Sequence, residues 1–159
     1  MNIGLTGAND VMATDLESIG ILKEDSLSLA TEEGKKYELW GSGHELIDEL
    51  QGEPTLTVSG IIIQVPEDIR KKLWEVSEQG SGDAKKMQVK SLVTKEKYSV
   101  QFASKVVGSE TFEAPKCSVS MKPVFSETEG WTAEFSFKII KSKITGVLFQ
   151  FGTVASSAV

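Results

Sequence analysis

The sequence predicts a mainly β fold, an antiparallel β-sandwich or partly closed barrel with one flanking α-helix at about residues 66–79. The first observation is alternation of apolar and polar side chains, which is clearest over residues 132–139 and recurs over 55–63, 98–102 and 117–122. Such alternation is typical of strands, because successive side chains point to opposite faces of a sheet. The second observation is that only one stretch of the chain has helical spacing.

That helical stretch follows Pro66, which suits the first turn of a helix because no backbone donor is needed there. Ile69, Leu73 and Val76 are spaced by four and three residues and would form one apolar stripe. Gly80 fits a left-handed C-terminal cap. The pattern therefore predicts a single helix packed on the flank or the open end of the sheet.

In the first half of the chain, short alternating runs at 27–29 and 37–39 predict two strands, with a hairpin turn at residues 33–34 between them. Residues 46–50 fit either a short strand or a helical turn. The sequence Gln-Gly-Glu-Pro at 51–54 then breaks the chain before the strand at 55–63.

In the second half, a run ending at Thr94 predicts a further strand, and residues 104–115 predict a longer loop. Pro123 is expected to end the strand that contains residues 117–122. A turn near 141–143 leads to alternating apolar residues at 147–151, which predicts a closing hairpin. The whole chain therefore predicts about seven to nine strands, with no internal repeat.

The chain has 159 residues, of which 40% are hydrophobic and 25% charged, as in one ordinary globular domain. We expect a flexible N-terminal arm at 1–20, a single domain at 21–152 and a C-terminal tail at 153–159. The N-terminus lacks a basic region followed by an apolar stretch, and no apolar run approaches a membrane-spanning length. A single cysteine excludes an intramolecular disulfide. These features predict no membrane anchor and folding in a reducing cytoplasm.

The formal net charge is −6, which disfavours a protein that grips nucleic acid phosphates. The charge is uneven along the chain. Residues 1–53 hold 12 acids and three lysines, a net of −9, whereas residues 54–159 hold 11 acids and 14 basic residues, a net of +3. Two interpretations stay open: chance on a solvated surface, or acidic and basic faces that meet between copies of the subunit.

The chain contains one histidine and one cysteine, too few for a Cys/His zinc cluster within one chain. His44 lies in a Gly-Ser-Gly context, and although Glu45 is adjacent, no nucleophile stands at a defined spacing. An exposed loop histidine is the better interpretation. Cys117 alternates with Val119 and Met121 on an apolar face, which predicts a buried small side chain rather than a reactive thiol.

No other motif predicts a catalytic, cofactor-binding or metal-binding residue, so we expect neither enzyme activity nor a cofactor. The glycines at 41, 43, 80 and 82 complete no phosphate-binding loop, and the acid pairs Asp48–Glu49 and Glu127–Glu129 are the pairs expected by chance in an acidic chain. Basic side chains gather at one stretch, where we expect a subunit contact or a solvated face: Lys85, Lys86, Lys90, Lys95 and Lys97. Three tryptophans are expected to be core or interface anchors: Trp40, Trp74 and Trp131.

Three stretches resemble the tail tube (major tail) proteins of bacteriophages: GEPTLTVSG at 52–60, FEAPKCSVSMKP at 112–123 and EGWTAEFSFKI at 129–139. The order of the parts is also similar: a polar arm, short strands, one mid-chain helix opened by proline, and a final hairpin. The resemblance covers roughly residues 20–152. That family is in turn similar to the tube proteins of type VI secretion systems.

The resemblance implies a β-sandwich or barrel with one flanking helix, and a subunit that forms rings, usually hexamers. The rings would stack into a hollow tube through which DNA passes without specific binding, together with other tail proteins. The expected location is the virion tail, assembled in the cytoplasm of a bacterial host. An acidic chain is compatible with a lumen that DNA does not stick to.

Two other classes remain as alternatives. One is a different phage structural module, a head–tail connector or a tail terminator. The other is a β-sandwich binding module, which would stay small in solution or bind a sugar through exposed aromatic side chains. The tube hypothesis instead predicts concentration-dependent rings or filaments, with an arm at 1–20 that becomes ordered on assembly.

Overall fold

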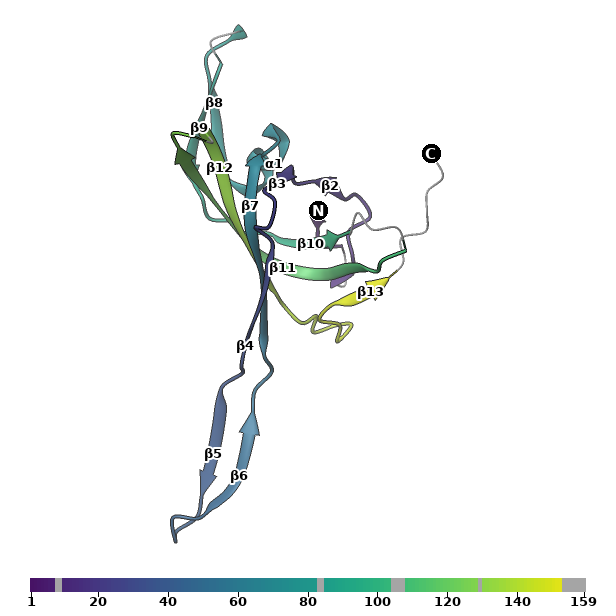
Figure 1. Ribbon diagram of the computed structural model, residues 1–159, viewed down its shortest axis with the longest axis vertical. Coiled ribbons are helices and arrows are strands. Elements are labelled where there is room, and N and C mark those ends of the chain that lie inside the picture. Colours follow the sequence, from purple (N-terminus) through teal and green to yellow (C-terminus); the bar gives the residue numbers. More distant parts are fainter. Residues whose placement is uncertain (8–9, 83–84, 104–107, 129, 153–159) are drawn as a thin grey trace.

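The structure is a computed structural model that describes residues 1–7, 10–82, 85–103, 108–128 and 130–152 (Figure 1). Within these residues it contains thirteen strands and one helix, so the predicted mainly β class is confirmed. The elements are β1 (Asn2–Leu5), β2 (Glu17–Ser18), β3 (Ile21–Leu22), β4 (Ser28–Glu32), β5 (Lys36–Trp40), β6 (Leu46–Gln51), β7 (Thr55–Gln64), α1 (Glu67–Leu73), β8 (Glu75–Gln79), β9 (Lys86–Ser91), β10 (Lys97–Phe102), β11 (Thr111–Ser126), β12 (Gly130–Ile139) and β13 (Gln150–Gly152).

Nine of the strands form one antiparallel sheet with the order β2-β1-β10-β11-β12-β7-β3. The outer edge of β7 is shared, because β4 pairs with its first half and β3 with its end. In the same way, β13 pairs with the first residues of β11, and β12 pairs with the rest of that strand. The hairpins β5–β6 and β8–β9 are separate two-stranded sheets.

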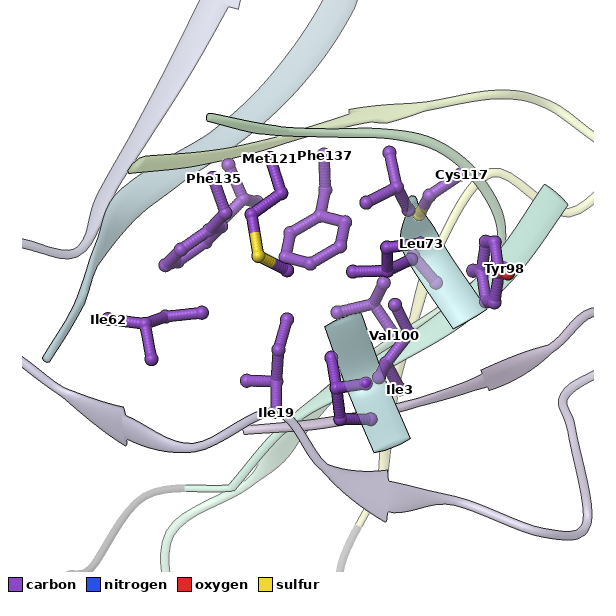
Figure 2. Close-up of a cluster of buried hydrophobic side chains, with 14 of the residues drawn as sticks. Ile3, Ile19, Ile62, Leu73, Tyr98, Val100, Cys117, Met121, Phe135 and Phe137 are labelled. Carbon is purple, nitrogen blue, oxygen red and sulfur yellow. The ribbon is translucent and has the colours of Figure 1, made fainter. Parts of the chain in front are cut away.

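One core joins the two halves of the main sheet. The long strand β11 pairs with β10 near its start and with β12 further along, so it belongs to both halves. Figure 2 shows Met121, Phe135 and Phe137 facing Ile62 and Val100 across the buried cluster. This arrangement has the character of a sandwich, and no closed barrel forms among the described strands.

The alternation predicted over residues 132–139 is confirmed. Phe135 and Phe137 are at most 2% exposed, and Ala133 and Ile139 are also buried. Phe135 lies opposite Gly60 in β7, where a Cβ atom would come within 2.7 Å of the ring. The glycine therefore makes room for the phenylalanine, and the two positions determine how closely β7 and β12 pack.

The predicted helix at about 66–79 is too long, and Gly80 does not cap it. The helix α1 covers only Glu67–Leu73, and Trp74 is already extended, with φ −116° and ψ 150°. The indole of Trp74 is buried and donates a hydrogen bond of 3.0 Å to the carbonyl oxygen of Met121. This contact turns the chain out of the helix, and residues 75–79 form β8, which pairs with β9.

The segment predicted to be an N-terminal arm contributes to the main sheet in the structure. Strand β1 pairs with β10, and β2 pairs with β1. Ile3 and Ile19 are 3% and 0% exposed and belong to the core. The apolar side chains that make this packing are widely spaced in the sequence. They therefore form no regular hydrophobic pattern from which the strands could be predicted.

The hairpin turn predicted at residues 33–34 is wrong. Strand β4 pairs with β7, and β5 pairs with β6, so the chain turns at residues 41–45 instead. At residues 33–35 the chain does not turn back but runs alongside Gly52. The backbone N–H of Gly52 donates a hydrogen bond of 2.9 Å to the carbonyl oxygen of Lys35. A Cβ atom on Gly34 would lie within 1.9 Å of the carbonyl oxygen of Gly52. The two glycines therefore permit a close crossing, and residues 46–50 form a strand.

Strand β11 does not end at Pro123, because it continues to Ser126. Its pairing with β10 stops at Ser118, and beyond that residue its described sheet partner is β12 alone. Proline is tolerated on such a free edge, where no ladder bond is required of its nitrogen. The predicted loop at 104–115 is also too long, since β11 begins at Thr111; residues 104–107 lie outside the described part.

The closing hairpin forms its turn, but its last strand pairs elsewhere. Ser142 donates a backbone hydrogen bond of 2.9 Å to the carbonyl of Val147, so a turn follows β12 near the predicted place. Strand β13 then pairs with β11 rather than β12. Phe149 and Phe151 pack on Phe112, with ring centroids 5.1 and 5.7 Å away. The predicted tail at 153–159 lies outside the described residues.

Candidate functional site

The hairpin of β5 and β6 carries the densest group of exposed apolar side chains. We call residues 36–51 the acidic hairpin. Its six large apolar residues are all between 48% and 65% exposed: Tyr37, Leu39, Trp40, Leu46, Ile47 and Leu50. Large apolar groups gathered on a projecting element indicate an interaction surface, whereas scattered ones do not.

Nothing in the described chain supports this hairpin from the side. It pairs with no third strand, and each of its strand residues is exposed. Tyr37 lies opposite Leu50, while Glu38 lies opposite Glu49 on the other face. Like charges directly across a strand pair are unfavourable, and a two-stranded ribbon alone is marginal in water. A partner surface that covers the apolar face of the ribbon would stabilise it.

The acidic hairpin holds one lysine and four acids, a net of −3 with His44 neutral. Three of the acids have local contacts. Glu49 is 3.4 Å from Lys36, Glu38 accepts a hydrogen bond of 3.0 Å from the indole of Trp40, and Asp48 accepts one from the backbone of Glu49. The side chain of Glu45, at the turn, has no such contact among the described residues.

A basic stretch lies in the opposite part of the molecule. We call residues 85–97 the basic segment; it holds five lysines and one glutamate, a net of +4. It also exposes apolar side chains, since Val89, Leu92 and Val93 are 46%, 40% and 69% exposed. This composition suits a contact with an acidic, partly apolar surface better than a contact with solvent alone.

Within the basic segment the lysines have acidic neighbours at one end. Glu78 of β8 lies 2.6 Å from both Lys71 and Lys85, and Lys71 also lies 2.7 Å from Glu67. Hydrogen bonds from Lys71 and Lys85 hold the pKa of Glu78 below its ordinary value. All these groups are exposed, so the network orients the base of β8 and β9 rather than stabilising a core.

In Figure 1 the basic segment begins at the end of the molecule opposite the acidic hairpin and runs back along β9 towards β10. The acidic hairpin forms one end, and the β8–β9 hairpin forms the other, beside the turn between β11 and β12. A molecule with complementary surfaces at its two ends can bind a second copy in the same orientation. Repetition of such a contact builds an open stack.

The three tryptophans have different positions. Trp74 is buried in the core, whereas Trp40 and Trp131 are 56% and 70% exposed. Trp131 packs against the exposed ring of Phe125 with centroids 5.1 Å apart. Two of the tryptophans therefore lie on surfaces, one on the acidic hairpin and one near the opposite end.

The residues considered as chemical candidates do not come together. His44 lies exposed in the turn of the acidic hairpin, with φ +60°, next to Glu45 in the sequence. Gly41 and Gly43 belong to that same turn, while Gly80 and Gly82 lie in the connection after β8. Asp48 and Glu49 are on the hairpin, and Glu129 lies outside the described residues. Among those that are described, no three His, Cys, Asp or Glu side chains are grouped as metal ligands.

Cys117 is fully buried in β11, opposite Ile139. Burial raises the pKa of its thiol to about 12. The reactive thiolate is therefore scarce at neutral pH, and the side chain fills space in the core.

We expect Cys117 to resist thiol reagents in the folded protein. At pH 8 an Ellman-type reagent should label less than about a tenth of the thiol in the time that it labels a urea-unfolded sample completely. In the folded protein the reagent cannot reach the buried side chain, and little of the thiol is in the reactive thiolate form. Absorbance of the released chromophore measures the labelling. Equal labelling rates with and without urea would contradict the burial of this side chain.

The sequence matches no protein-family model and no curated protein. Within the described parts of the chain, no helix has the length and apolar character needed to span a bilayer.

The apolar face of the acidic hairpin is the functional feature that the sequence did not single out. Tyr37 and Leu39 alternate with charged residues, as in any strand that covers a core. A usable signal was nevertheless present: two such runs flank a short Gly-rich turn and together hold an excess of acids. A solvated strand needs no such set of apolar residues.

Proposed function

We propose that this chain is a structural subunit that assembles with copies of itself into stacked rings around a hollow conduit, as the tail tube of a bacteriophage. The single observation that carries the proposal is the acidic hairpin, with six exposed large apolar side chains at one end of the molecule. Such an exposed apolar surface favours aggregation of a monomer, whereas in an assembly it is covered by a partner.

The direction of the molecule supports stacking in particular. A contact between the acidic hairpin of one copy and the basic segment of the next would be head-to-tail, which is heterologous and can repeat without limit. Charge complementarity also favours one register over others. The lateral contacts that close a ring would involve other surfaces of the subunit. The geometry of those contacts would determine the number of subunits in each ring.

The assignment to a phage tail rests on the resemblance of residues 52–60, 112–123 and 129–139 to tail tube proteins. The same resemblance implies a hexameric ring, assembly in a bacterial cytoplasm, other tail proteins as partners, and passage of DNA through the lumen. The net charge of −6 suits a conduit that DNA passes without binding.

Negative-stain electron microscopy of the purified protein, with light scattering over a concentration series, tests the proposal. Rings or tubes of uniform diameter with a central hole are the expected result, and their fraction should rise with protein concentration. Raising the salt concentration should weaken stacking, because the acidic hairpin and the basic segment carry opposite net charge.

A protein that stays monomeric at millimolar concentration in low salt would overturn self-assembly as its own property. A connector, a tail terminator or a sugar-binding module would then be the better hypothesis. Binding to a panel of immobilised oligosaccharides would separate the last of these from the other two.

A further inference from the structure

Arg70 is the only arginine among the 17 basic residues of the chain. It lies in α1 and is half-buried. Its Nε is buried and has no hydrogen-bond partner, and no described acidic side chain lies within ion-pair distance of its guanidinium. A buried polar atom without a partner is unfavourable and rare, so it calls for a specific explanation.

Arg70 lines a surface pocket of about 270 Å³. Trp74 and Trp131 contribute aromatic walls, and Pro123 and Thr132 complete one side. The volume is just below the range of small-molecule sites, which makes a single protruding side chain a better occupant than a cofactor. The pocket lies between α1, the end of β7 and the outer parts of β11 and β12, in the half of the molecule away from the acidic hairpin (Figure 1).

The chemistry of this pocket favours a carboxylate. A guanidinium presents a planar fork of donors that a carboxylate accepts in pairs, and such charge-assisted bonds are stronger in a partly desolvated site. Trp131, which is 70% exposed, offers an apolar wall for the stem of the incoming side chain. A phosphate would fit the fork as well, but the aromatic walls favour an acidic side chain with apolar neighbours.

Glu45 has the properties that the pocket requires. It lies at the turn of the acidic hairpin, it is exposed, and its side chain has no contact among the described residues. Exposed Trp40, Leu46 and Ile47 surround it in the sequence and supply apolar contacts. The turn lies at one end of the molecule, and the elements that line the pocket lie in its other half, so a contact between them joins two copies.

We propose that the Arg70 pocket binds the carboxylate of Glu45 from the acidic hairpin of a second copy, and that this ion pair sets the register of stacking. The inference rests on the proposed self-assembly and makes it specific. Each copy would offer its hairpin turn to one neighbour and its pocket to the other.

The experiment compares the protein concentration at half-assembly, measured by light scattering and sedimentation, for the full chain and its variants. Arg70→Gln and Glu45→Gln should each raise that concentration at least tenfold. Matched controls remove one charge from the same elements: Lys72→Gln on α1 and Glu49→Gln on the acidic hairpin should change it less than threefold. Because Glu45 is exposed at a turn, Glu45→Gln tests the contact without threatening the fold.

Charge reversal separates a direct contact from a general charge effect. Arg70→Glu and Glu45→Arg should each prevent stacking, and the double variant should restore assembly to within about threefold of the unmodified chain. Melting curves of each variant confirm that it is folded.

Unchanged assembly of Arg70→Gln and Glu45→Gln would overturn the inference while the unmodified chain still formed tubes, so the proposed function would stand. Failure of the double variant to recover would overturn the pairing of these two residues. A chain that never assembles would overturn both proposals.

Discussion

Replacing Tyr37, Leu39 and Leu50 together by threonine should abolish assembly and leave the domain folded. The three side chains are 60–65% exposed, and their alternation and pairing place them on one face of the acidic hairpin. Burial of the exposed part of each side chain against a partner contributes about 1–2 kcal/mol. Loss of all three therefore weakens the subunit contact by about 3–6 kcal/mol, which is more than a hundredfold in the association constant.

Threonine keeps the β propensity of the ribbon, so the change acts on the surface and not on the strands. Electron microscopy and sedimentation of the triple variant measure assembly, and a thermal melt measures folding. The melting temperature should stay within about 2 °C of the unmodified chain, because exposed positions away from special features contribute little to stability.

The control is Ile144→Thr, which removes an apolar side chain that is 64% exposed in the turn after β12. It should assemble as the unmodified chain does, because a scattered exposed side chain carries no contact of its own. Tubes formed by the triple variant at unchanged concentration would show that the apolar face of the hairpin is not a subunit interface. The proposed stacking contact would then have to be sought elsewhere.

The sequence predicted the fold class and the strands of the core because alternation is a local signal. Phe135 and Phe137 lie two residues apart in one run, and their burial follows from the period alone. Strand pairing depends instead on residues far apart in the chain. The pairing of β4 with β7, and of β13 with β11, joins residues that are about 20 to 40 positions apart, and no local pattern contains that information.

The helix shows how a tertiary contact overrides local spacing. Val76 continues the spacing of Ile69 and Leu73, so the sequence extends the helix past its end. In the structure the burial of Trp74 and its bond to the carbonyl of Met121 draw the chain outwards instead. The contact joins residues 47 positions apart, which local spacing cannot anticipate.

The candidate surfaces were predictable only in part. The uneven charge along the chain suggested acidic and basic faces that meet between copies, and the structure separates such surfaces in space. The Arg70 pocket is different, because its walls come from α1, β7, β11 and β12. No pattern in the sequence singled out Arg70, and the missing partner of its Nε becomes visible only once its neighbours are placed.

The largest effect on stability should come from Phe137→Ala. Phe137 is fully buried, and its ring packs against Phe135 at 5.1 Å and Phe102 at 6.4 Å between centroids. Truncation removes the transfer energy of the ring and leaves a cavity between the sheet halves, which together cost about 3–5 kcal/mol. Since a domain of this size has a net stability of about 5–15 kcal/mol, the variant should be close to unfolding.

Urea denaturation followed by tryptophan fluorescence measures this loss, and Lys138→Ala is its matched control. Lys138 is the next residue of β12, exposed on the opposite face, so its truncation should change the free energy of unfolding by less than about 0.5 kcal/mol. A small loss for Phe137→Ala would mean that the two halves of the sheet are not joined through this ring. The expected large loss would separate folding from assembly: Phe137→Ala loses assembly because it loses the fold, whereas the triple variant of the acidic hairpin loses assembly from a folded chain.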